Sequence, residues 1–578
     1  MNEPDAAPES PIDGNVASRL TMVAKLMGGA IAIAQPTGRP VRPGGGTRPY
    51  RLTTFKQLDD RSTHIARGLI ALGVRPGDRM VSLVPFSDGF ISLVFGLLKT
   101  GAEIVLIDPG IDRRHLLRCL SEANPDGFVG IPRAMAVRWW FHRRFPSAVK
   151  NVTAGVPTWA ERLWPGPSLA STERKGRQVS DVPLPRRERD DPAAIIFTTG
   201  STGPPKGVAY THGTFHAQID RIRERYDIHR GSRDLACFPL FGLFDAVMGV
   251  TTVIPDMDPT RPADVNPENL IHAADQWECD QAFGSPALWK TVVHWADQHV
   301  VAGRPLGSVR RLLSAGAPVP AATLQKLRTI VHEDAEIHTP YGATEALPVA
   351  SIESREIIAQ TGPAAAKGKG VCVGTRFEGV RWKVIEISDG PIATLADAPE
   401  VPRGGIGELM VSGPMVTTRY KVRADQNAMH KVADGDAVWH RMGDLGYLDD
   451  RDRFWFCGRK AHRVTGGNRT WFTLPCEAVF AAHPRVNRSA LIGWGKPGSQ
   501  TPVMVVEPVD SPEKNLRDEL RDLARRNPLT LRIEHFVVWP RPLPVDIRHN
   551  SKIFRERIAA ELNERPERFG LCRRPGGN

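Results

Sequence analysis

The sequence predicts an α/β protein of several lobes, and three observations support this class. First, the chain has 578 residues, and a single hydrophobic core stops growing at roughly 250–300 residues. Second, residues 54–108 alternate helix-like and strand-like segments in the manner of βαβ units. Third, from about residue 370 the chain changes to short strands separated by turns. We therefore expect a large N-terminal domain of α/β subdomains with a β-rich subdomain, followed by a small C-terminal α+β domain.

Composition places the boundaries of these parts. Residues 1–20 begin MNEPDAAPESPIDG, a poor start for a helix, and are expected to be disordered. Residues 21–458 are assigned to the N-terminal domain. After Arg459 another α/β pattern runs to the end of the chain, so residues 459–578 are long enough for a small separate domain.

The strands and helices can be followed in order along the N-terminal domain. Within residues 54–108, an amphipathic helix, the turn GVRPGD, a strand, a second helix and a second strand succeed one another. DPAAIIFTTG, VRRLLSAGAPVP and AEIHTPYGATE are three further strand-to-loop transitions. Ligands of open α/β sheets bind where loops leave the carboxyl ends of strands. The loops near residues 200, 316 and 343 are thus expected to meet at one site.

Several function classes are disfavoured by composition. No run of about 18 apolar residues occurs, because the most apolar segment, from Met80, is interrupted by Pro85, Asp88 and Lys99. The acidic N-terminus lacks the pattern of a secretory signal, so we expect a cytoplasmic protein without a transmembrane segment. The seven cysteines are scattered without a CxxC pair, which predicts reduced packing residues.

The net charge of +12 suits an anionic partner. The basic residues are spread along the chain and form no zinc-finger or RNP-type pattern. We therefore expect no nucleic-acid partner, and a phosphorylated small molecule or an anionic surface remains compatible with the charge.

The stretch TTGSTGPPKG, residues 198–207, suggests a phosphate-binding loop. Glycine lets the backbone approach phosphate oxygens closely, and the N–H and hydroxyl groups can surround them. The Walker pattern fails, because Lys206 lies between Pro205 and Gly207, and GxGxxG fails as well. Taken alone, the stretch also fits a solvated surface turn.

The wider sequence resembles the acyl-adenylate-forming (AMP-forming) enzyme superfamily over nearly all of residues 50–560. Six motifs occur in the order of that superfamily: IIFTTGSTGPPKGVAYTHGT, SAGAPVP, YGATEALP, RMGDLGYLDD, CGRKAHRV and NSKIFRERI. The resemblance implies the acyl-adenylate-forming enzyme fold with a mobile C-terminal lid, ATP and Mg²⁺ as cofactors, and the formation of acyl-AMP and pyrophosphate from a carboxylic acid.

The resemblance also implies a nucleotide site. Hydroxyl and glycine residues with a lysine would bind the phosphates, the SAGAPVP and YGATE segments would hold adenine, and an aspartate with an arginine would hold the ribose. These residues are Thr199, Gly200, Ser201, Thr202, Gly203, Lys206, Gly316, Ala317, Pro318, Tyr341, Gly342, Ala343, Asp444 and Arg459.

Three catalytic residues are implied by the same motifs. Thr344 and Glu345 would bind the α-phosphate and Mg²⁺, because a carboxylate is a hard oxygen ligand. Lys552 would bridge the carboxylate nucleophile and the α-phosphate and offset the charge that builds up in the transition state.

The acceptor of the acyl group is not implied by these motifs, because relatives transfer it to CoA, to a carrier protein or to another nucleophile. The hinge motif departs from the usual pattern: Ala461 stands where Asp or Lys is usual, Thr465 replaces a lysine, and Ser551 replaces a glycine. These departures fall in the region that relatives reposition for thioester formation. They are equally compatible with a lost CoA site and with neutral change.

The segment from Phe238 predicts an apolar pocket for the acyl chain. Its proposed lining is Phe238, Phe241, Phe244, Met248 and Phe283. In an apolar surrounding and without a carrier domain downstream, Asp245 reads as a helix cap or local contact rather than as a partner for an α-ammonium group.

IPDMDPTRPADVNP and TPYGATEALPVASI together resemble the β-lactone synthetase family of bacterial long-chain olefin biosynthesis. That resemblance implies a long-chain 2-alkyl-3-hydroxy acid whose own hydroxyl attacks the acyl-AMP and closes a β-lactone. The base is open: His212, His338 and His462 read as structural, and the phosphate of the departing AMP could accept the proton.

Two other functions stay open. A long-chain acyl-CoA ligase of the same superfamily would form a CoA-dependent thioester. A catalytically silent acyl-adenylate-binding protein is disfavoured, because Glu345, Asp444 and Lys552 are present. The basic charge and apolar product fit contact with other enzymes of the olefin pathway or with a membrane surface.

Overall fold

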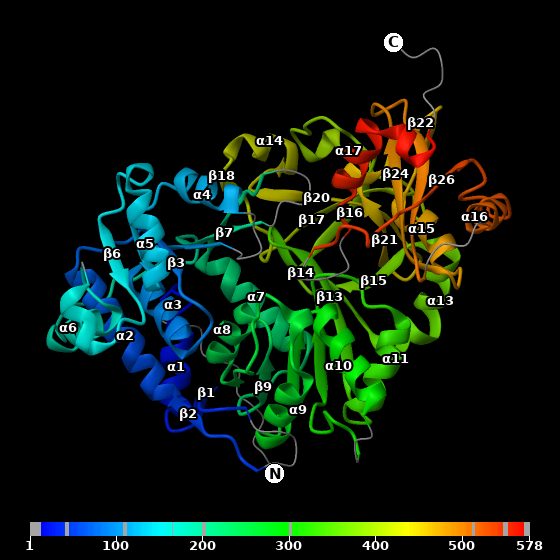
Figure 1. The fold of residues 1–578 in the computed structure, drawn as a ribbon. Coiled ribbons are helices and arrows are strands. Elements are labelled where there is room, and N and C mark those ends of the chain that lie inside the picture. The colour runs from blue at the N-terminus through cyan, green and yellow to red at the C-terminus, as the bar shows by residue number, and fades with distance from the viewer. Residues whose placement is uncertain are drawn as a thin grey trace.

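The computed structural model describes residues 13–40, 46–107, 113–164, 166–198, 204–299, 303–510, 515–546 and 553–571. Two large sheets carry the fold, two small sheets follow toward the C-terminus, and helices surround them (Figure 1). The predicted α/β class is confirmed.

The larger sheet joins a parallel half to an antiparallel half, in the order β16-β17-β20-β21-β15-β14-β13-β12-β11-β9-β10-β1-β2 with β19 beside β20. The parallel half consists of β1 (Ile31–Pro36), β9 (Arg233–Ala236), β10 (Thr251–Val253), β11 (Gln281–Gly284), β12 (Arg311–Ser314) and β13 (Glu336–Ala343), and β2 (Tyr50–Thr54) pairs antiparallel to β1 at its edge. The second half consists of β14 (Ala346–Glu353), β15 (Val371–Arg376), β16 (Arg381–Ile385), β17 (Gly407–Ser412), β19 (Lys431–Asp434), β20 (Ala437–Leu448) and β21 (Arg453–Arg459). The predicted β-rich segment after residue 370 is thus part of the same sheet.

The second sheet has seven strands in the order β18-β8-β7-β4-β3-β5-β6. Its members are β3 (Arg79–Leu83), β4 (Glu103–Leu106), β5 (Gly127–Gly130), β6 (Lys150–Thr153), β7 (Pro192–Phe197), β8 (Gly207–Thr211) and β18 (Tyr420–Val422). Strands β3 to β7 pair in parallel, and β8 and β18 add antiparallel pairs at one edge.

Helices follow most of the parallel strands, as the βαβ pattern predicted. They are α1 (Ser18–Met27), α2 (Phe55–Ala71), α3 (Asp88–Thr100), α4 (Arg113–Glu122), α5 (Pro132–Trp140), α6 (Leu169–Gln178), α7 (His212–Arg225), α8 (Pro239–Met248), α9 (Pro267–Gln276), α10 (Pro286–Gln298) and α11 (Ala321–Ile330). Thr54 caps α2 through a capping box with Gln57, and Gly101 ends α3 in the left-handed conformation. Figure 1 shows α9, α10 and α11 along the outside of the larger sheet.

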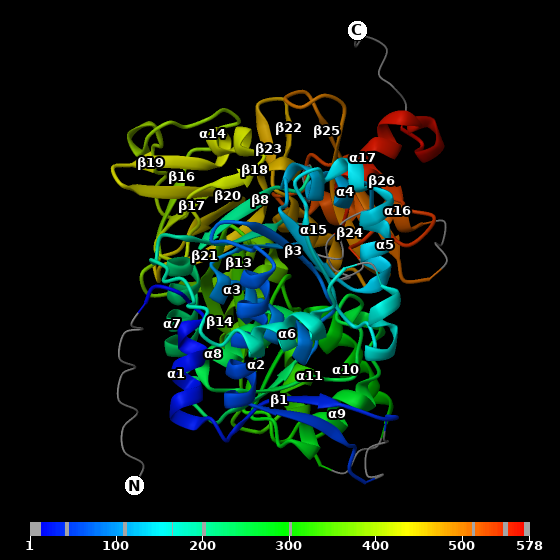
Figure 2. The same cartoon turned by 90° about the vertical axis from the view of Figure 1, so that its left-hand side faces the viewer.

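The N-terminal segment differs from the expectation of disorder through residue 20. Val16, Ala17 and Leu20 are buried, and the Asn15 side chain donates to the carbonyl of Leu98. Helix α1 packs beside α2 and α8 (Figure 2). Three apolar residues within six positions bury enough surface to order this segment despite its proline-rich start.

The C-terminal part has small sheets of its own. A hairpin of β22 (Val464–Gly466) and β23 (Arg469–Trp471) precedes a sheet of β24 (Val486–Trp494), β25 (Thr501–Pro508) and β26 (His535–Val538). The helices are α15 (Thr473–Ala481), α16 (Leu516–Arg525) and α17 (Arg555–Glu564). Its two hydrophobic clusters are formed by residues after 463 alone, and the predicted domain boundary at Arg459 stays a prediction.

The main hydrophobic cluster joins the two large sheets. It contains side chains of α3, α7 and α8 together with side chains of both sheets. The six cysteines among the described residues are buried and free, as expected for packing residues, and Cys572 lies outside the described residues. No helix among the described residues is long and apolar enough to cross a membrane.

Candidate active site

A large cavity of about 1950 Å³ lies between the two large sheets and the C-terminal part. Its walls include residues of the SAGAPVP, YGATE, RMGDLG and CGRKAH segments and many apolar residues. Ligand sites for one small molecule are typically about 300–1,000 Å³. This cavity therefore has room for a nucleotide and a second, apolar substrate.

Three residues predicted for the nucleotide site, Asp444, Arg459 and Tyr341, lie in one cluster on the cavity wall. Asp444 on β20 lies directly opposite Arg459 on β21 in the antiparallel ladder. The Arg459 guanidinium lies 2.9 Å from Oδ1 of Asp444, and the hydroxyl of Tyr341 donates to Oδ2. Asp444 raises the pKa of Arg459, and burial and Asp444 raise that of Tyr341. Each carboxylate oxygen has a second lone pair, so both can still accept a ribose hydroxyl.

The turn that carries Thr344 and Glu345 is held from three sides. The two residues connect β13 and β14 as a two-residue hairpin, since Ala343 pairs with Ala346. Tyr210 donates its hydroxyl to the carbonyl of Thr344 at 2.5 Å. Tyr420 donates to Oε1 of Glu345 at 2.7 Å, and both the backbone N–H and the hydroxyl of Thr417 donate to its carbonyl at 2.9 Å. The Glu345 carboxylate is thereby fixed against the cavity.

Two lysines flank the Tyr420 ring beside Glu345. The Lys206 ammonium lies 5.2 Å from the ring centroid and donates to Nε2 of His430 at 2.8 Å. The Lys431 ammonium lies 5.5 Å from the centroid and donates to the carbonyl of Thr417 at 2.5 Å. Two cations on one aromatic ring next to a carboxylate create a local site for an anion.

Burial shifts the titration of these basic groups. It lowers the pKa of Lys431 to about 7. It also lowers the pKa of His430 to about 3, with a further contribution from the nearby Lys206 charge. The pKa of Lys206 itself is lowered as well. Burial and the Glu345 carboxylate raise the pKa of Tyr420, so its phenol stays protonated and donates. A phosphate in the cavity would favour the charged form of both lysines.

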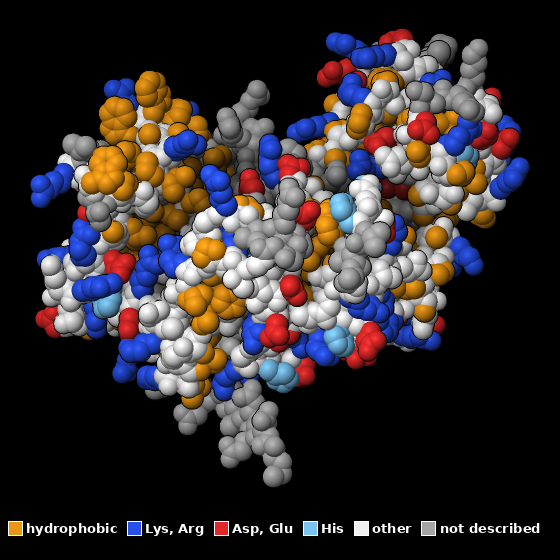
Figure 3. Space-filling view, turned by 60° about the horizontal axis from the view of Figure 1, so that its bottom comes forward, with side chains coloured by type: hydrophobic (Ala, Val, Ile, Leu, Met, Phe, Trp, Pro, Cys, Tyr) orange, Lys and Arg blue, Asp and Glu red, His pale blue; other side chains and the backbone are white. Residues whose placement is uncertain are grey.

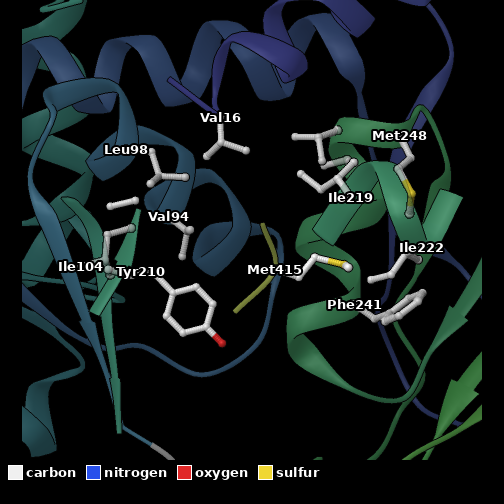
Figure 4. Close-up of a cluster of buried hydrophobic side chains, with 14 of the residues drawn as sticks. Val16, Val94, Leu98, Ile104, Tyr210, Ile219, Ile222, Phe241, Met248 and Met415 are labelled. Carbon is white, nitrogen blue, oxygen red and sulfur yellow. The ribbon is translucent and has the colours of Figure 1, made fainter. Parts of the chain in front are cut away.

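Much of the remaining cavity wall is apolar. Figure 4 shows Val94, Leu98, Ile104 and Tyr210 on one side and Ile222 and Phe241 on the other, with Met415 between the two groups. Phe238, Phe241, Phe244 and Phe283 line the cavity, as proposed for the acyl pocket. Met248 is buried in the adjoining core and does not contribute to the lining.

The structure brings most of the predicted site residues together. The described residues among them that line the cavity are Lys206, Gly316, Ala317, Pro318, Tyr341, Gly342, Ala343, Thr344, Glu345, Asp444 and Arg459. Five residues of the phosphate loop, Thr199, Gly200, Ser201, Thr202 and Gly203, and the lysine of the last motif, Lys552, lie outside the described residues.

Two glycines have structural roles of their own. A Cβ on Gly342 would lie 2.7 Å from the carbonyl oxygen of Ala346, so glycine is needed to close the β13–β14 hairpin. Gly316 has φ of 101°, a conformation that L side chains rarely adopt. The prediction that these glycines serve close approach of the base stays a prediction.

The three histidines considered earlier have structural partners. His212 is the first residue of α7, and its Nδ1 accepts a hydrogen bond from the backbone N–H of Val16. Burial lowers the pKa of His212 to about 4. His338 contacts Glu336, and His462 contacts Glu556 at 2.6 Å, although His462 also reaches the cavity wall.

The Asp245 side chain of α8 takes part in a local contact with β10 rather than in a helix cap. Its Oδ2 accepts from the hydroxyl of Thr252 at 3.3 Å, and burial next to Asp234 raises its pKa. The interpretation as a local contact fits this geometry.

The hinge segment, whose sequence departs from the usual pattern, is bonded to the larger sheet. Lys460 donates to Glu408 and to the carbonyl of Ser388, both at 2.9 Å, and Glu408 also pairs with buried Arg441. Thr465, in the position of the usual lysine, accepts from the backbone of Gly498.

Several residues of the site were missed by sequence reasoning. Tyr420, His430, Lys431 and Thr417 belong to no quoted motif. Tyr420 and Thr417 bond to Glu345 from more than 70 positions away in the chain, His430 contacts Lys206, and Lys431 contacts Thr417. The apolar residues of α3 and α7 that line the cavity were missed as well, because an apolar helix face reads as ordinary core.

The chain is similar over most of its length to several known proteins. A family model described as "AMP-binding enzyme" matches residues 31–421. The olefin beta-lactone synthetase of Stenotrophomonas maltophilia is 43% identical over 570 residues, covering 95% of this chain and 99% of that protein. The feruloyl-CoA synthase of an Amycolatopsis species is 26% identical over 82% of this chain and 86% of its own length.

The fold also matches a solved structure. ATP-bound MatB from Rhodopseudomonas palustris aligns with a TM-score of 0.75 at 19% sequence identity, covering 96% of this chain and 99% of MatB. At this identity the match concerns the fold, and it includes the C-terminal part of the chain.

Proposed function

Because this chain belongs to the AMP-binding enzyme family, we propose that it adenylates a long-chain 2-alkyl-3-hydroxy acid and closes the acyl-adenylate to a β-lactone. The observation that carries this proposal is the 43% identity to an olefin beta-lactone synthetase over almost the full length of both chains. The relative whose name denotes CoA ligation is markedly less similar.

The large cavity supports a reaction between ATP and an apolar acid. Its polar end has the Asp444–Arg459 pair for the ribose and Lys206 with Glu345 near the phosphates. Its apolar walls come from two sides, which suits an acid with two alkyl chains. The acid carboxylate would lie at the junction, next to the Thr344–Glu345 turn.

In the first step a carboxylate oxygen of the acid attacks the α-phosphorus of ATP, and the bond to the bridging oxygen of pyrophosphate breaks. The developing negative charge is stabilised by preorganised cations. We assign this role to Lys552 and to Lys206, whose ammonium His430 and Tyr420 hold beside the cavity. Tyr341 would contact adenine, and Gly316, Ala317 and Pro318 would line the same end.

The residues present fit one Mg²⁺ bound with ATP. Mg²⁺ typically takes one or two carboxylates and completes its shell with water and phosphate oxygens. Glu345 lines the cavity, Tyr420 occupies its Oε1, and no described residue donates to its Oε2. Bound there, Mg²⁺ would neutralise phosphate charge.

In the second step the 3-hydroxyl oxygen attacks the acyl carbon, the bond to AMP breaks, and a four-membered lactone forms. The hydroxyl proton leaves with the AMP phosphate or through a base of the site. No external nucleophile is needed, because the hydroxyl and the activated carbonyl are held in one molecule. The absence of a lysine at Thr465 fits an enzyme without a CoA step.

The decisive experiment supplies ATP, Mg²⁺ and a 2-alkyl-3-hydroxy acid, with and without CoA, and identifies the product by mass spectrometry and NMR. We expect a β-lactone in both reactions, with AMP and pyrophosphate in equal amounts. A CoA-dependent thioester without lactone would identify a long-chain acyl-CoA ligase instead.

A matched substrate separates the two steps. The same acid without its 3-hydroxyl should release pyrophosphate and accumulate acyl-AMP, because only ring closure is blocked. Absence of pyrophosphate release from both acids would contradict the adenylation step itself.

ATP consumption agrees with the cytoplasm as the site of action, and a lactone product would require a further enzyme to consume it.

A further inference from the structure

Five large hydrophobic side chains are exposed close together in the chain. They are Val137, Trp139, Trp140, Val149 and Trp159, with 51–77% of their surface exposed. They account for half of the ten exposed large hydrophobic side chains among the described residues and for every tryptophan in that group. Exposed apolar residues normally occur singly, whereas a cluster marks an interaction site. We call this cluster the tryptophan patch.

The fold leaves this patch without a partner in the chain. Helix α5 packs on β5 and buries only Met135. Strand β6 is the last strand of its sheet, Val149 immediately precedes it, and Trp159 follows it. Figure 3 shows hydrophobic side chains gathered on this lobe, with Lys and Arg side chains around them.

The segment that carries the patch is basic. No aspartate or glutamate occurs between Asp126 and Glu161. Arg133, Arg143 and Arg144 are exposed in this interval, and none of them forms an ion pair with a described carboxylate. Exposed arginines are normally interspersed with acids, so this segment is suited to an anionic surface.

The apolar side chains continue from the patch to the cavity. Met135 on the inner face of α5 belongs to a hydrophobic cluster that also includes Leu83, Ile107 and Leu116. These last three residues line the cavity. One hydrophobic cluster therefore connects the inner side of the patch with the wall of the substrate site.

We propose that the tryptophan patch docks the protein on the surface of an anionic lipid bilayer. Tryptophan rings reside at the boundary between headgroups and acyl chains, and arginines next to them pair with anionic headgroups. Three tryptophans and two valines would enter this boundary, and Arg133, Arg143 and Arg144 would face the phosphates. This is attachment to the interface, distinct from a membrane span.

A bilayer explains the composition better than a protein partner does. Protein interfaces pair their arginines with individual acids, whereas a basic segment without acids matches a uniformly anionic surface. If the proposed function also holds, its two-chain acid would be dissolved in the bilayer, next to the apolar connection to the cavity. The docking itself depends on the patch and not on that substrate.

The test measures flotation of the full-length protein with vesicles of phosphatidylcholine alone and with about 30% phosphatidylglycerol, at low and high salt. We expect binding to the anionic vesicles that weakens with salt. Arg143→Gln with Arg144→Gln should weaken it about 30-fold, because each basic residue at such a surface is worth about a factor of five. Trp139→Ser with Trp140→Ser should weaken it at least about tenfold.

A matched control is Leu531→Ser, which removes a 54% exposed leucine of the C-terminal part and should leave vesicle binding unchanged. All variants should keep wild-type pyrophosphate release with a short, water-soluble acid, which shows that they fold.

Three results would overturn the proposal: no binding to anionic vesicles, binding that the patch variants share with wild type, or equal binding to neutral vesicles. Self-association in solution that Trp139→Ser abolishes, without vesicle binding, would mean that the patch binds protein instead. Vesicle binding without lactone formation would leave the docking surface standing and reject the proposed function.

Discussion

At the scale of single residues, the Glu345 carboxylate shows how a cavity becomes a phosphate site. Tyr420 donates to it, and Lys206 and Lys431 lie on the face of the same tyrosine ring. The phenol is neutral and buried, so it orients the carboxylate without adding charge. A hydrogen bond to a charged group is worth about 1.5–3 kcal/mol.

We expect Tyr420→Phe to slow adenylation about tenfold and to raise the Mg²⁺ concentration needed for half-maximal rate. The phenyl ring keeps the packing, while Glu345 loses its donor. Pyrophosphate release against Mg²⁺ concentration measures both effects. Tyr447→Phe, which removes a hydroxyl bonded to the carbonyl of Lys369, is the control and should behave as wild type. An unchanged Mg²⁺ dependence in Tyr420→Phe would refute the positioning role.

Lys552→Ala should reduce pyrophosphate release about 10²–10³-fold, because removing one preorganised charge-stabilising group has this typical cost. The KM for ATP should change much less, since the lysine acts mainly on the transition state. Steady-state kinetics with ATP varied separates the two. Wild-type pyrophosphate release from this variant would remove Lys552 from the catalytic group.

A buried carboxyl pair makes stability depend on pH. Burial raises the pKa of Asp234 to about 7, and that of Asp245 is raised as well. The folded state therefore holds protons that the unfolded state, with ordinary carboxyl pKa values near about 4, has lost. Stability contributed by this pair is greatest below about pH 4 and declines as the pH rises toward 7.

We expect Asp234→Asn to reduce this decline. The free energy of unfolding of the variant, compared with that of wild type, should therefore increase from pH 5 to pH 7.5. Urea unfolding at the two pH values, compared between variant and wild type, isolates this pair from other groups. Asp436→Asn, at an exposed position, is the control and should follow wild type. A wild-type pH dependence in Asp234→Asn would contradict the raised pKa.

At the scale of elements, two helices cross at contact distance because each has a glycine there. A Cβ on Gly176 of α6 would lie 1.8 Å from the carbonyl oxygen of His64 in α2, and a Cβ on Gly68 would lie 2.0 Å from that of Thr172. Backbone atoms cannot move aside as a flexible side chain can. The two glycines therefore set the separation of α2 and α6.

Gly176→Ala should destabilise the protein by about 1–3 kcal/mol, the usual cost of overpacking, despite the better helix propensity of alanine. Gly89→Ala is the matched control, because a Cβ at Gly89 in α3 meets nothing closer than the Ser87 hydroxyl at 3.6 Å. Thermal unfolding of the two variants measures the difference. Equal melting temperatures would show that the crossing can relax.

Sequence could predict the elements that have local signals. The alternating segments of residues 54–108 correspond to α2, β3, α3 and β4. The loop expected near residue 343 is instead the tight β13–β14 hairpin. The motif alone could not predict this, because the chain returns as an antiparallel strand only through pairing with residues outside the motif. The Tyr420–Glu345 contact could not be predicted, because it joins strand β18 of one sheet to the β13–β14 turn of the other, and the neighbours of neither residue indicate the contact.

At the scale of the whole molecule, the site depends on three parts of the chain at once. Both large sheets line the cavity, and Thr473, Leu474 and Arg555 of the C-terminal part complete its wall. The sequence predicted the parts from length and composition. It could not predict their packing, because residues far apart in the chain form the joining surfaces.

ATP should therefore stabilise the molecule as a unit through the Asp444–Arg459 pair. At an ATP concentration of 100 times Kd, binding adds about 2.7 kcal/mol to the free energy of unfolding. Asp444→Asn keeps the shape but weakens the bonds to the ribose by roughly 2 kcal/mol, so the same ATP concentration should add only about 1 kcal/mol. Calorimetry of both proteins with and without ATP gives the two increments. Comparing increments removes the effect of the substitution on the ATP-free protein, where Arg459 loses its charged partner. Equal increments would show that ATP does not contact Asp444, and the nucleotide would then have to occupy another part of the cavity.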